Sequence, residues 1–320
     1  MEMRDQVVGY TDKMVSLTGI TRKKILKEIG ITLSKYYDWK KRYGNPNNHN
    51  CKSPKDHCIT KEEIEIITEY AKENNGEGYR RLSYMMIDEN VAFVSPSSVY
   101  RVLFSKGLLQ KWENNSDSKK GNGFEQPTKV HEHWHIDIKY VNFKGAFLFL
   151  ISIIDGYSRY IVHHGLRRSM QEYDVEIVLQ QALELYPGVR PRIISDNGTQ
   201  FISKDFKNFL SHVQLVHVRT SIAYPQSNGK IERFHKTINQ ECLTKNSLID
   251  FDDAVKQINS YINFYNTQRL HSALYYLTPE DYLLGRDKER IKVRCMKLNK
   301  AKTMRKEYYQ KQDFSIAFSN

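Results

Sequence analysis

Apolar positions recur with a helical period in the first third of the chain and with a strand period further on. In residues 61–75, Ile64, Ile67 and Tyr70 fall on one side of a helix. From His133 onward, alternation and short continuous apolar runs take over, and these are typical of half-buried and fully buried strands. We therefore expect a helical N-terminal part followed by an α/β part.

The second part should form a mixed sheet with helices on both faces. Strands are predicted at residues 134–143, 146–154, 160–165, 192–195 and 215–219. Helices are predicted at residues 170–185, 204–213, 226–242 and 251–265. The first three strands follow one another so closely that they must pair antiparallel, and the later alternation of helix and strand completes an α/β architecture.

Residues 1–50 carry the layout of a helix-turn-helix. Thr21 is expected to cap a helix that must end at Gly30, and a second helix is expected from Ser34 onward. The residues expected to pack inward are Ile25 and Leu26, with Tyr37 and Trp39 or their neighbours. The residues expected to face a DNA groove and its phosphates are Lys35, Tyr36, Lys40 and Arg42. A small basic three-helix domain that binds a protein is the alternative.

Turn and linker signals divide the rest of the chain. Pro96 suits the first turn of a helix and Gly107 suits a helix end, so helices are expected at 61–75, 78–89 and 97–106. The segments that follow from this pattern are 58–110, a second helical DNA-binding module; 111–129, a flexible linker; 130–285, the α/β domain; and 286–320, a basic tail.

Composition points to a polyanionic partner. The 320 residues are 40% hydrophobic, enough for a sizeable core, and 49 Lys and Arg face 37 Asp and Glu, a formal net charge of +12. The N-terminus lacks a signal-peptide pattern, and the longest apolar run, 146–154, is far short of the roughly 20 residues that cross a bilayer. These features predict a cytoplasmic protein without a membrane partner.

Four cysteines in such a chain are expected to be ordinary thiols. One cluster combines histidine with cysteine, but it lacks the paired spacing of zinc sites, so zinc is not favoured there. Its members are His49, Cys51, His57 and Cys58.

Two aspartates stand where a ligand site could be built. Asp137 falls on the polar face of a strand whose neighbour is apolar throughout, so its carboxylate would need a cation or a hydrogen-bond donor. Asp196 directly follows a short apolar strand, and the carboxyl ends of strands are where α/β sheets bind ligands. Taken alone, Asp137 could be a satisfied structural acid and Asp196 part of an Asp-Asn-Gly turn.

A third acid, Glu232, lies early in a predicted helix. Asn228, His235 and Lys236 share its face, and Gly229 would allow a DNA backbone to approach. An acid among basic and amide groups suits a metal site that faces phosphate. A solvated face with a Glu–Lys pair explains the same pattern.

Three segments together resemble the signature blocks of the retroviral-integrase superfamily. They are residues 134–140 (WHIDIKY), 195–201 (SDNGTQF) and 223–233 (AYPQSNGKIER). Thirty-five residues separate Asp196 from Glu232, the spacing that gives the DD35E group its name. The chain also resembles bacterial transposases of the insertion sequence three family, at residues 78–81, 155–160, 265–274 and 278–280. The resemblance covers about residues 60–285; Lys139 stands where many members carry threonine, which we do not expect to remove activity.

This resemblance implies a DNA transposase with an RNase H-like, five-stranded catalytic core. Asp137 would bridge two Mg²⁺ ions, with Asp196 and Glu232 completing one site each, and Mn²⁺ is expected to substitute. The implied reaction cuts at the terminal inverted repeats of an insertion sequence and joins the freed 3′-hydroxyl to target DNA. DNA contacts are expected from Asn228, Lys230, Arg233 and Lys236.

The implied partners are double-stranded DNA, as terminal repeats and as target, and further copies of the chain in a homodimer or larger assembly that bridges two DNA ends. The expected location is the bacterial cytoplasm, at the nucleoid. The tail adds to the DNA contacts, because residues 285–311 hold eleven Lys or Arg against three acids, although a solvated, partly helical tail is the alternative. A metal-dependent nuclease of the same fold and a non-enzymatic repressor derived from a transposase are the competing functions.

Overall fold

The computed structural model describes residues 3–44, 58–109, 126–219 and 228–317, with side chains up to residue 309. Several sequence predictions lie outside these ranges: three of the four candidate zinc ligands (His49, Cys51 and His57), most of the predicted linker, and residues 223–227 of the third signature block. In the described part of the chain, no helix is long and apolar enough to span a bilayer.

The first unit is helical, as predicted, and contains three helices among the described residues. Its helices are α1 (Met3–Thr18), α2 (Arg22–Ile29) and α3 (Leu33–Lys41). Gly30 ends α2 in the left-handed region with φ 75°, which confirms the role given to it. The side chain of Thr21 makes no capping hydrogen bond, whereas Thr32 caps α3 by accepting one from the Lys35 backbone. The inward face of α3 is set by Tyr36, which is 0% exposed, and Tyr37 points outward.

A second helical module follows, close to the predicted boundaries. Its helices are α4 (Lys61–Glu73), α5 (Tyr79–Asp88) and α6 (Pro96–Ser105). A capping box between Thr60 and Glu63 starts α4, and Ser95 caps α6 with Pro96 in its first turn. The small core of this module consists of Ile67, Tyr70, Leu82, Met86, Ala92, Val94, Val99, Val102 and Leu103.

The α/β domain is built on one five-stranded sheet with the order β3-β2-β1-β4-β5. The strands are β1 (His133–Phe143), β2 (Ala146–Asp155), β3 (Ile161–Arg167), β4 (Arg192–Ser195) and β5 (His217–Arg219). β1 pairs antiparallel with β2, which pairs antiparallel with β3, while β1–β4 and β4–β5 are parallel. The sheet is therefore mixed and RNase H-like, as predicted.

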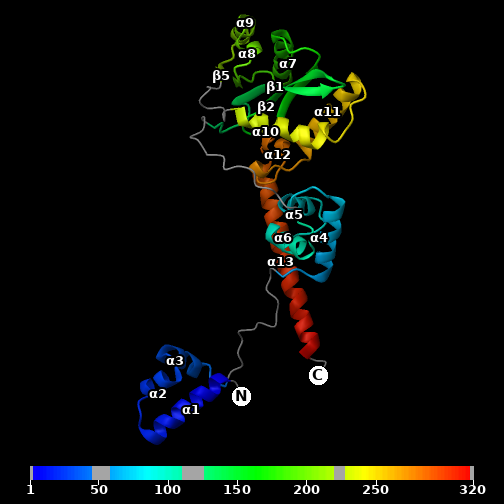
Figure 1. The fold of residues 1–320 in the computed structure, drawn as a ribbon. Coiled ribbons are helices and arrows are strands. Elements are labelled where there is room, and N and C mark those ends of the chain that lie inside the picture. The colour runs from blue at the N-terminus through cyan, green and yellow to red at the C-terminus, as the bar shows by residue number, and fades with distance from the viewer. Residues whose placement is uncertain (1–2, 45–57, 110–125, 220–227, 318–320) are drawn as a thin grey trace. The chain divides into compact units, whose positions relative to one another are not determined.

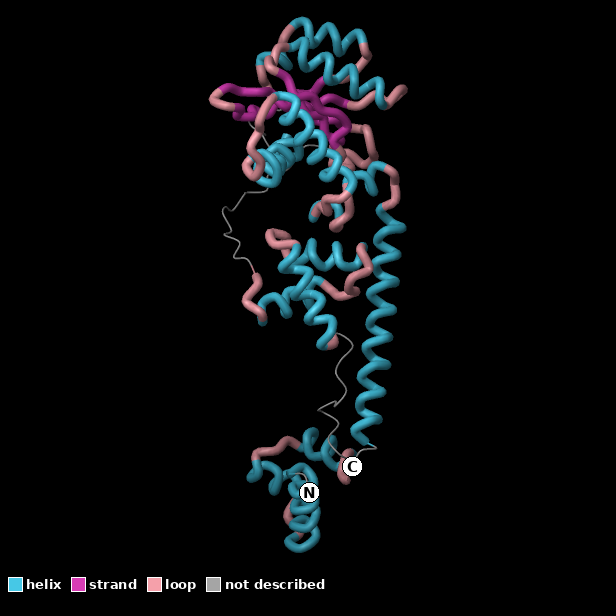
Figure 2. Tube along the Cα trace, turned by 90° about the vertical axis from the view of Figure 1, so that its right-hand side faces the viewer, coloured by secondary structure: helices cyan, strands magenta, loops and turns pink. Residues whose placement is uncertain are grey.

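Helices cover both faces of this sheet (Figure 1), and the strands lie between two helical layers (Figure 2). One face packs on α7 (Glu172–Leu185), α8 (Thr199–Ile202) and α9 (Lys204–His212). The other packs on α10 (Gly229–Ile238), the π-helix η2 (Asn239–Leu243) and α11 (Phe251–Thr267). The single long helix predicted for 226–242 is thus an α-helix that passes into a π-helical turn. Two short elements follow, η3 (Ser272–Leu274) and α12 (Pro279–Leu283).

The C-terminal segment, which we predicted to be a basic tail, contains the helix α13 (Asp287–Ala317). Two of its arginines are buried, Arg294 at 4% and Arg305 at 7% exposure. Arg294 donates to both carboxylate oxygens of Asp88, at 2.8 and 2.5 Å, and Arg305 pairs with Glu63 at 2.8 Å. Part of the positive charge of α13 therefore holds the module of α4–α6 instead of being free for phosphate.

Candidate active site

Asp137 and Asp196 are brought together because β1 and β4 are parallel neighbours. The register pairs His135 with Ile194. Asp137 and Asp196 each lie two residues further along, so they stand level with each other where β4 ends. Two acids that are 59 positions apart in the sequence thus share one edge of the sheet.

A tight turn holds Asp196. Its Oδ1 accepts a hydrogen bond from the Gly198 backbone nitrogen at 2.9 Å. A Cβ atom on Gly198 would lie 3.1 Å from this oxygen and 2.5 Å from Nε2 of Gln200, so a side chain there would require the Gln200 amide to move. The Asp-Asn-Gly turn that we considered as an alternative does exist, and it leaves the second carboxylate oxygen of Asp196 available.

Helix α10 supplies the third acid. Ile231, Phe234 and Ile238 are fully buried against the sheet, which leaves Glu232 exposed on the helix surface. His235, one turn further along, is 8% exposed, and its Nδ1 lies 3.4 Å from Oδ2 of Asp137. The contact ties α10 to β1 at the position of Asp137.

The three acids influence one another electrostatically. Burial raises the pKa of Asp196, and the charge of Asp137 raises it further, against a hydrogen bond from Gly198. Burial also raises the pKa of Glu232, with Asp137 and Asp196 adding to the shift and His235 opposing it. The negative charges of the three acids therefore repel one another, and a bound cation would relieve this repulsion.

The donor set fits hard cations, because carboxylate oxygens are the ligands that Mg²⁺ prefers. Among the described residues, no three His, Cys, Asp or Glu side chains are close enough to hold one metal ion.

Four residues around Glu232 were expected to contact DNA, and they fall into two pairs, one exposed and one directed into the protein. Arg233 and Lys236 are exposed. Asn228 is only 3% exposed, and Lys230 donates from Nζ to the Gly156 carbonyl at 2.7 Å. Burial lowers the pKa of Lys230 to about 7, with nearby Arg159 adding to the shift. The side chains of Asn228 and Lys230 are thus directed into the protein.

The four N-terminal DNA-contact candidates are likewise engaged within their own unit. Tyr36 is fully buried, contrary to the exposed position expected for it, and its hydroxyl bonds to Asp12. Lys40 pairs with the same carboxylate at 2.7 Å, and Arg42 pairs with Asp38. Lys35 lies over the ring of Trp39 at 5.2 Å.

Two features of the site escaped the sequence analysis. His235 was placed on the Glu232 face, but only the fold shows that it reaches Asp137. Asp155 was expected only to form the turn between the second and third strands, with Gly156. It is 0% exposed and accepts hydrogen bonds from four donors, which are the backbone nitrogens of His131, Tyr157 and Ser158 and the hydroxyl of Ser158. The turn-forming sequence after Asp155 was the available signal, because such donors require a carboxylate at that position.

Comparison with known proteins agrees with this arrangement. Residues 127–225 and 214–279 match two sequence families, both described as integrase core domain. Residues 127–279 thus carry an integrase core domain of the kind found in DDE-type polynucleotidyl transferases. Transposases of bacterial insertion sequences are among the proteins similar to this chain.

Two relatives illustrate the likeness. The transposase of insertion sequence element IS904 from Lactococcus lactis is 27% identical over 191 residues, 56% of this chain and 75% of the relative. The putative transposase InsK of IS150 from Escherichia coli is 24% identical over 229 residues, 68% of this chain and 81% of the relative. Among solved structures, the HTLV-2 integrase catalytic core in complex with magnesium is similar at 20% identity and a TM-score of 0.40, over 49% of this chain and 98% of that one.

Proposed function

We propose that this transposase cuts DNA at the terminal inverted repeats of an insertion sequence and joins the freed ends to target DNA, with Asp137, Asp196 and Glu232 as its metal-binding catalytic residues. The observation that carries the proposal is the level placement of Asp137 and Asp196 on parallel strands, with Glu232 close enough for all three charges to interact. Such a set of oxygen ligands suits Mg²⁺, and Mn²⁺ should substitute.

Each acid has a distinct task in this proposal. Asp137 would contribute to both metal positions, while Asp196 and Glu232 would complete one each. Two bound metal ions would activate the attacking oxygen and stabilise the leaving oxygen in an in-line displacement. His235 contacts the Asp137 carboxylate from α10 and would help to position that carboxylate.

The family resemblance implies the two steps of the reaction. Water attacks the phosphodiester at the end of the element and breaks its P–O3′ bond, so that the element keeps a 3′-hydroxyl and the flanking strand a 5′-phosphate. That hydroxyl then attacks a phosphodiester of the target and releases the target's own 3′-hydroxyl. Arg233 and Lys236 are exposed beside Glu232 and would hold the DNA strand by its phosphates. The two helical regions, residues 3–44 and 58–109, would bind the DNA ends, and a dimer or larger assembly would bring two ends together.

The decisive experiment uses Mg²⁺ and a labelled duplex taken from the DNA that flanks the gene. Wild type should release a shortened strand and then a joined product, and Glu232→Gln should yield neither while still binding the duplex. Glu184→Gln, which alters an exposed glutamate of α7, is the matched control and should behave as wild type. Cutting without joining would replace the proposal with a nuclease, and binding without cutting by wild type would replace it with a repressor.

A further inference from the structure

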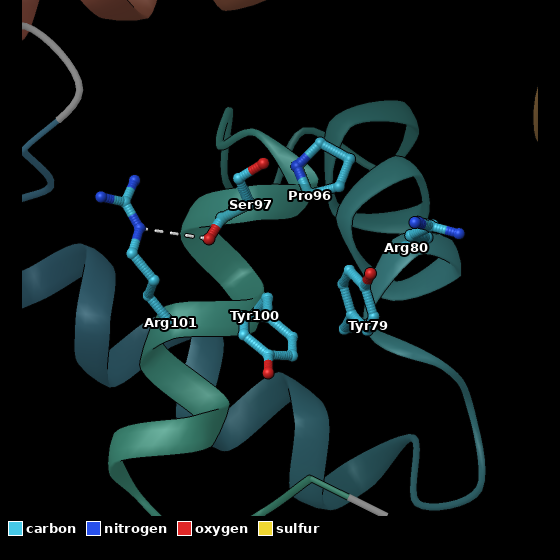
Figure 3. A pocket seen from close by; sticks show the side chains of 6 residues that line it. All are labelled: Tyr79, Arg80, Pro96, Ser97, Tyr100 and Arg101. Atoms are coloured by element: carbon cyan, nitrogen blue, oxygen red, sulfur yellow. Dashed lines mark hydrogen bonds between the residues drawn. The ribbon is translucent and has the colours of Figure 1, made fainter. Parts of the chain in front are cut away.

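Two pockets differ in their place and in their chemistry. The pocket between α5 and α6 is rich in tyrosine and arginine (Figure 3), and it belongs to the module that the proposed function already assigns to the DNA ends. A second pocket, of about 240 Å³, lies in the α/β domain between the end of β1 and the π-helix η2. None of the roles assigned above uses this second pocket.

The second pocket combines an apolar with a polar lining. Its apolar part consists of Val141, Phe143, Leu243 and Leu248. Val141 is only 2% exposed and the other three are half-buried, so apolar surface is held open beside the core. Pockets that bind small flat groups have this character, with a few polar side chains that fix the orientation of the ligand.

The polar part of the lining is dominated by amides. It consists of Asn142, Lys144, Asn239, Thr244 and Asn246. A phosphate would call for several cations, but Lys144 is the single cation of this lining, and its Nζ lies over the Phe143 ring at 5.5 Å. Each amide presents both a donor and an acceptor, a combination that matches the edge of a nucleobase and of adenine above all. The lining therefore favours a base over a phosphate.

The pocket lies further along the two elements that carry the acids. Asp137 and Val141 are on the same face of β1, four residues or about 13 Å apart. Glu232 and Asn239 are on the same face of the helix formed by α10 and η2, seven residues or about 10 Å apart. The two elements thus lead from the acids to the same pocket.

On each element a lysine lies between the acid and the pocket. Lys139 is half-buried on β1, and Lys236 is exposed on α10, one turn after Glu232. Their charges suit the phosphates of a DNA strand that runs from the acids toward the pocket. At about 3.4 Å per nucleotide along a strand, the distance corresponds to about three or four nucleotides.

We infer that this pocket receives an unpaired nucleobase, preferably adenine, from the DNA strand held at the three acids. The apolar side chains would lie against the face of the base, and the asparagine amides would pair with its edge. Such a contact selects sequence beside the cut, which phosphate contacts cannot do. The inference rests on the proposed function, because the strand that it reads is the strand that the enzyme cuts.

Extrusion of a base is measured with 2-aminopurine, an adenine analogue that fluoresces when it leaves the base stack. The full-length protein is added in EDTA to a duplex of about 40 base pairs from the DNA flanking the gene, with the analogue at one position at a time. Wild type should give a several-fold rise at one position, within about four nucleotides of the phosphate that it cuts when Mg²⁺ is supplied. An unlabelled duplex with thymine in place of adenine there should compete about tenfold less well.

Two variants should abolish this rise. Thr244→Trp fills the pocket from an exposed position, and Asn239→Ala/Asn246→Ala removes two amides. Both should keep the melting temperature of wild type and its overall affinity for the duplex, which phosphate contacts dominate. Asn208→Ala, which alters an exposed amide of α9 on the other side of the sheet, is the matched control and should leave the rise unchanged.

Three results would overturn the inference: no rise at any position with wild type bound to the duplex, an equal loss of the rise in Asn208→Ala, or a rise that persists in both pocket variants. Persistence together with a loss of self-association would identify the pocket as a contact between copies of the chain. Wild type that cuts without any rise refutes the pocket alone. Wild type that fails to cut, with a rise that Thr244→Trp abolishes, refutes the catalytic proposal and leaves the pocket as a base-binding site.

Discussion

Asp137 and Asp155 belong to neighbouring strands of one sheet, yet their surroundings differ. Asp155 is completely buried and accepts hydrogen bonds from four donors, so the protein itself satisfies it. In the described part of the chain, Asp137 accepts one hydrogen bond, from the Ile138 backbone at 2.8 Å, and otherwise lies beside His235 and two further acids. The fold therefore supplies more partners to the structural acid Asp155 than to the proposed metal ligand Asp137.

The largest expected effect is on activity. Asp137→Asn should reduce strand cutting by about 10³-fold or more, because the loss of a shared metal ligand removes several kcal/mol of transition-state stabilisation. Its melting temperature should equal or exceed that of wild type, since the change removes like-charge repulsion. Single-turnover cutting assays and thermal unfolding measure the two effects, and a marked loss of stability would place Asp137 in the same class as Asp155.

The converse change tests the structural acid. Asp155→Asn should lower the free energy of unfolding by about 2–4 kcal/mol, because an amide presents N–H groups to donors that need an acceptor. Urea unfolding measures this, with the exposed Asp205→Asn as a control that should stay within about 0.5 kcal/mol of wild type. Equal stability of the two variants would show that the Asp155 network is not needed for folding.

Added Mg²⁺ should stabilise the protein only through the unsatisfied acids. At ten times the dissociation constant the gain is about 1.4 kcal/mol, and Glu232→Gln should show less. Because the pKa values of Asp196 and Glu232 are raised, the folded protein holds protons there above the usual range near pH 4, and these protons compete with the metal. The thermal shift should therefore shrink as pH falls from 7 toward that range, and a shift independent of pH would argue against binding at these acids.

A further prediction concerns Lys230, a half-buried cation beside the same turn as Asp155. Its pKa falls from 10.5 to about 7 on folding, so the unfolded chain binds more protons between these values and stability should rise with pH. Relative to Lys230→Met, wild type should gain at most about 1.4 kcal/mol per pH unit, and less after solvent screening. Unfolding at pH 7, 8 and 9 measures this, with the exposed Lys236→Met as control, and parallel curves for wild type and Lys230→Met would contradict it.

Most of the sheet could be predicted from sequence because each strand is encoded locally. Apolar alternation and the turns between strands placed β1, β2 and β4 within about one residue of their observed ends. The carboxylate trio was recognisable as a group because its motifs keep their order and spacing. Its use by the enzyme remains a proposal, whereas the placement of Asp137 level with Asp196 follows from the parallel pairing of β1 and β4.

What escaped prediction depends on distant partners. Lys230 looked like a surface cation because its acceptor, the Gly156 carbonyl, lies 74 residues away in the chain. The phase of α3 was ambiguous because Tyr36 and Tyr37 are adjacent and equally able to fill a core, and Asp12 in another helix favours Tyr36. The buried face of α13 includes Arg294, which no hydrophobic pattern could reveal.

Arg294 also imposes an order in time. It lies 206 residues after its partner Asp88, and Arg305 lies 242 residues after Glu63. At translation speeds of about 5–20 residues per second, the α4–α6 module waits roughly 10–50 s on the ribosome with both carboxylates unpaired. The link between this module and α13 can therefore form only after Arg294 and Arg305 have been made, which is later than the synthesis of Asp137 and Asp196.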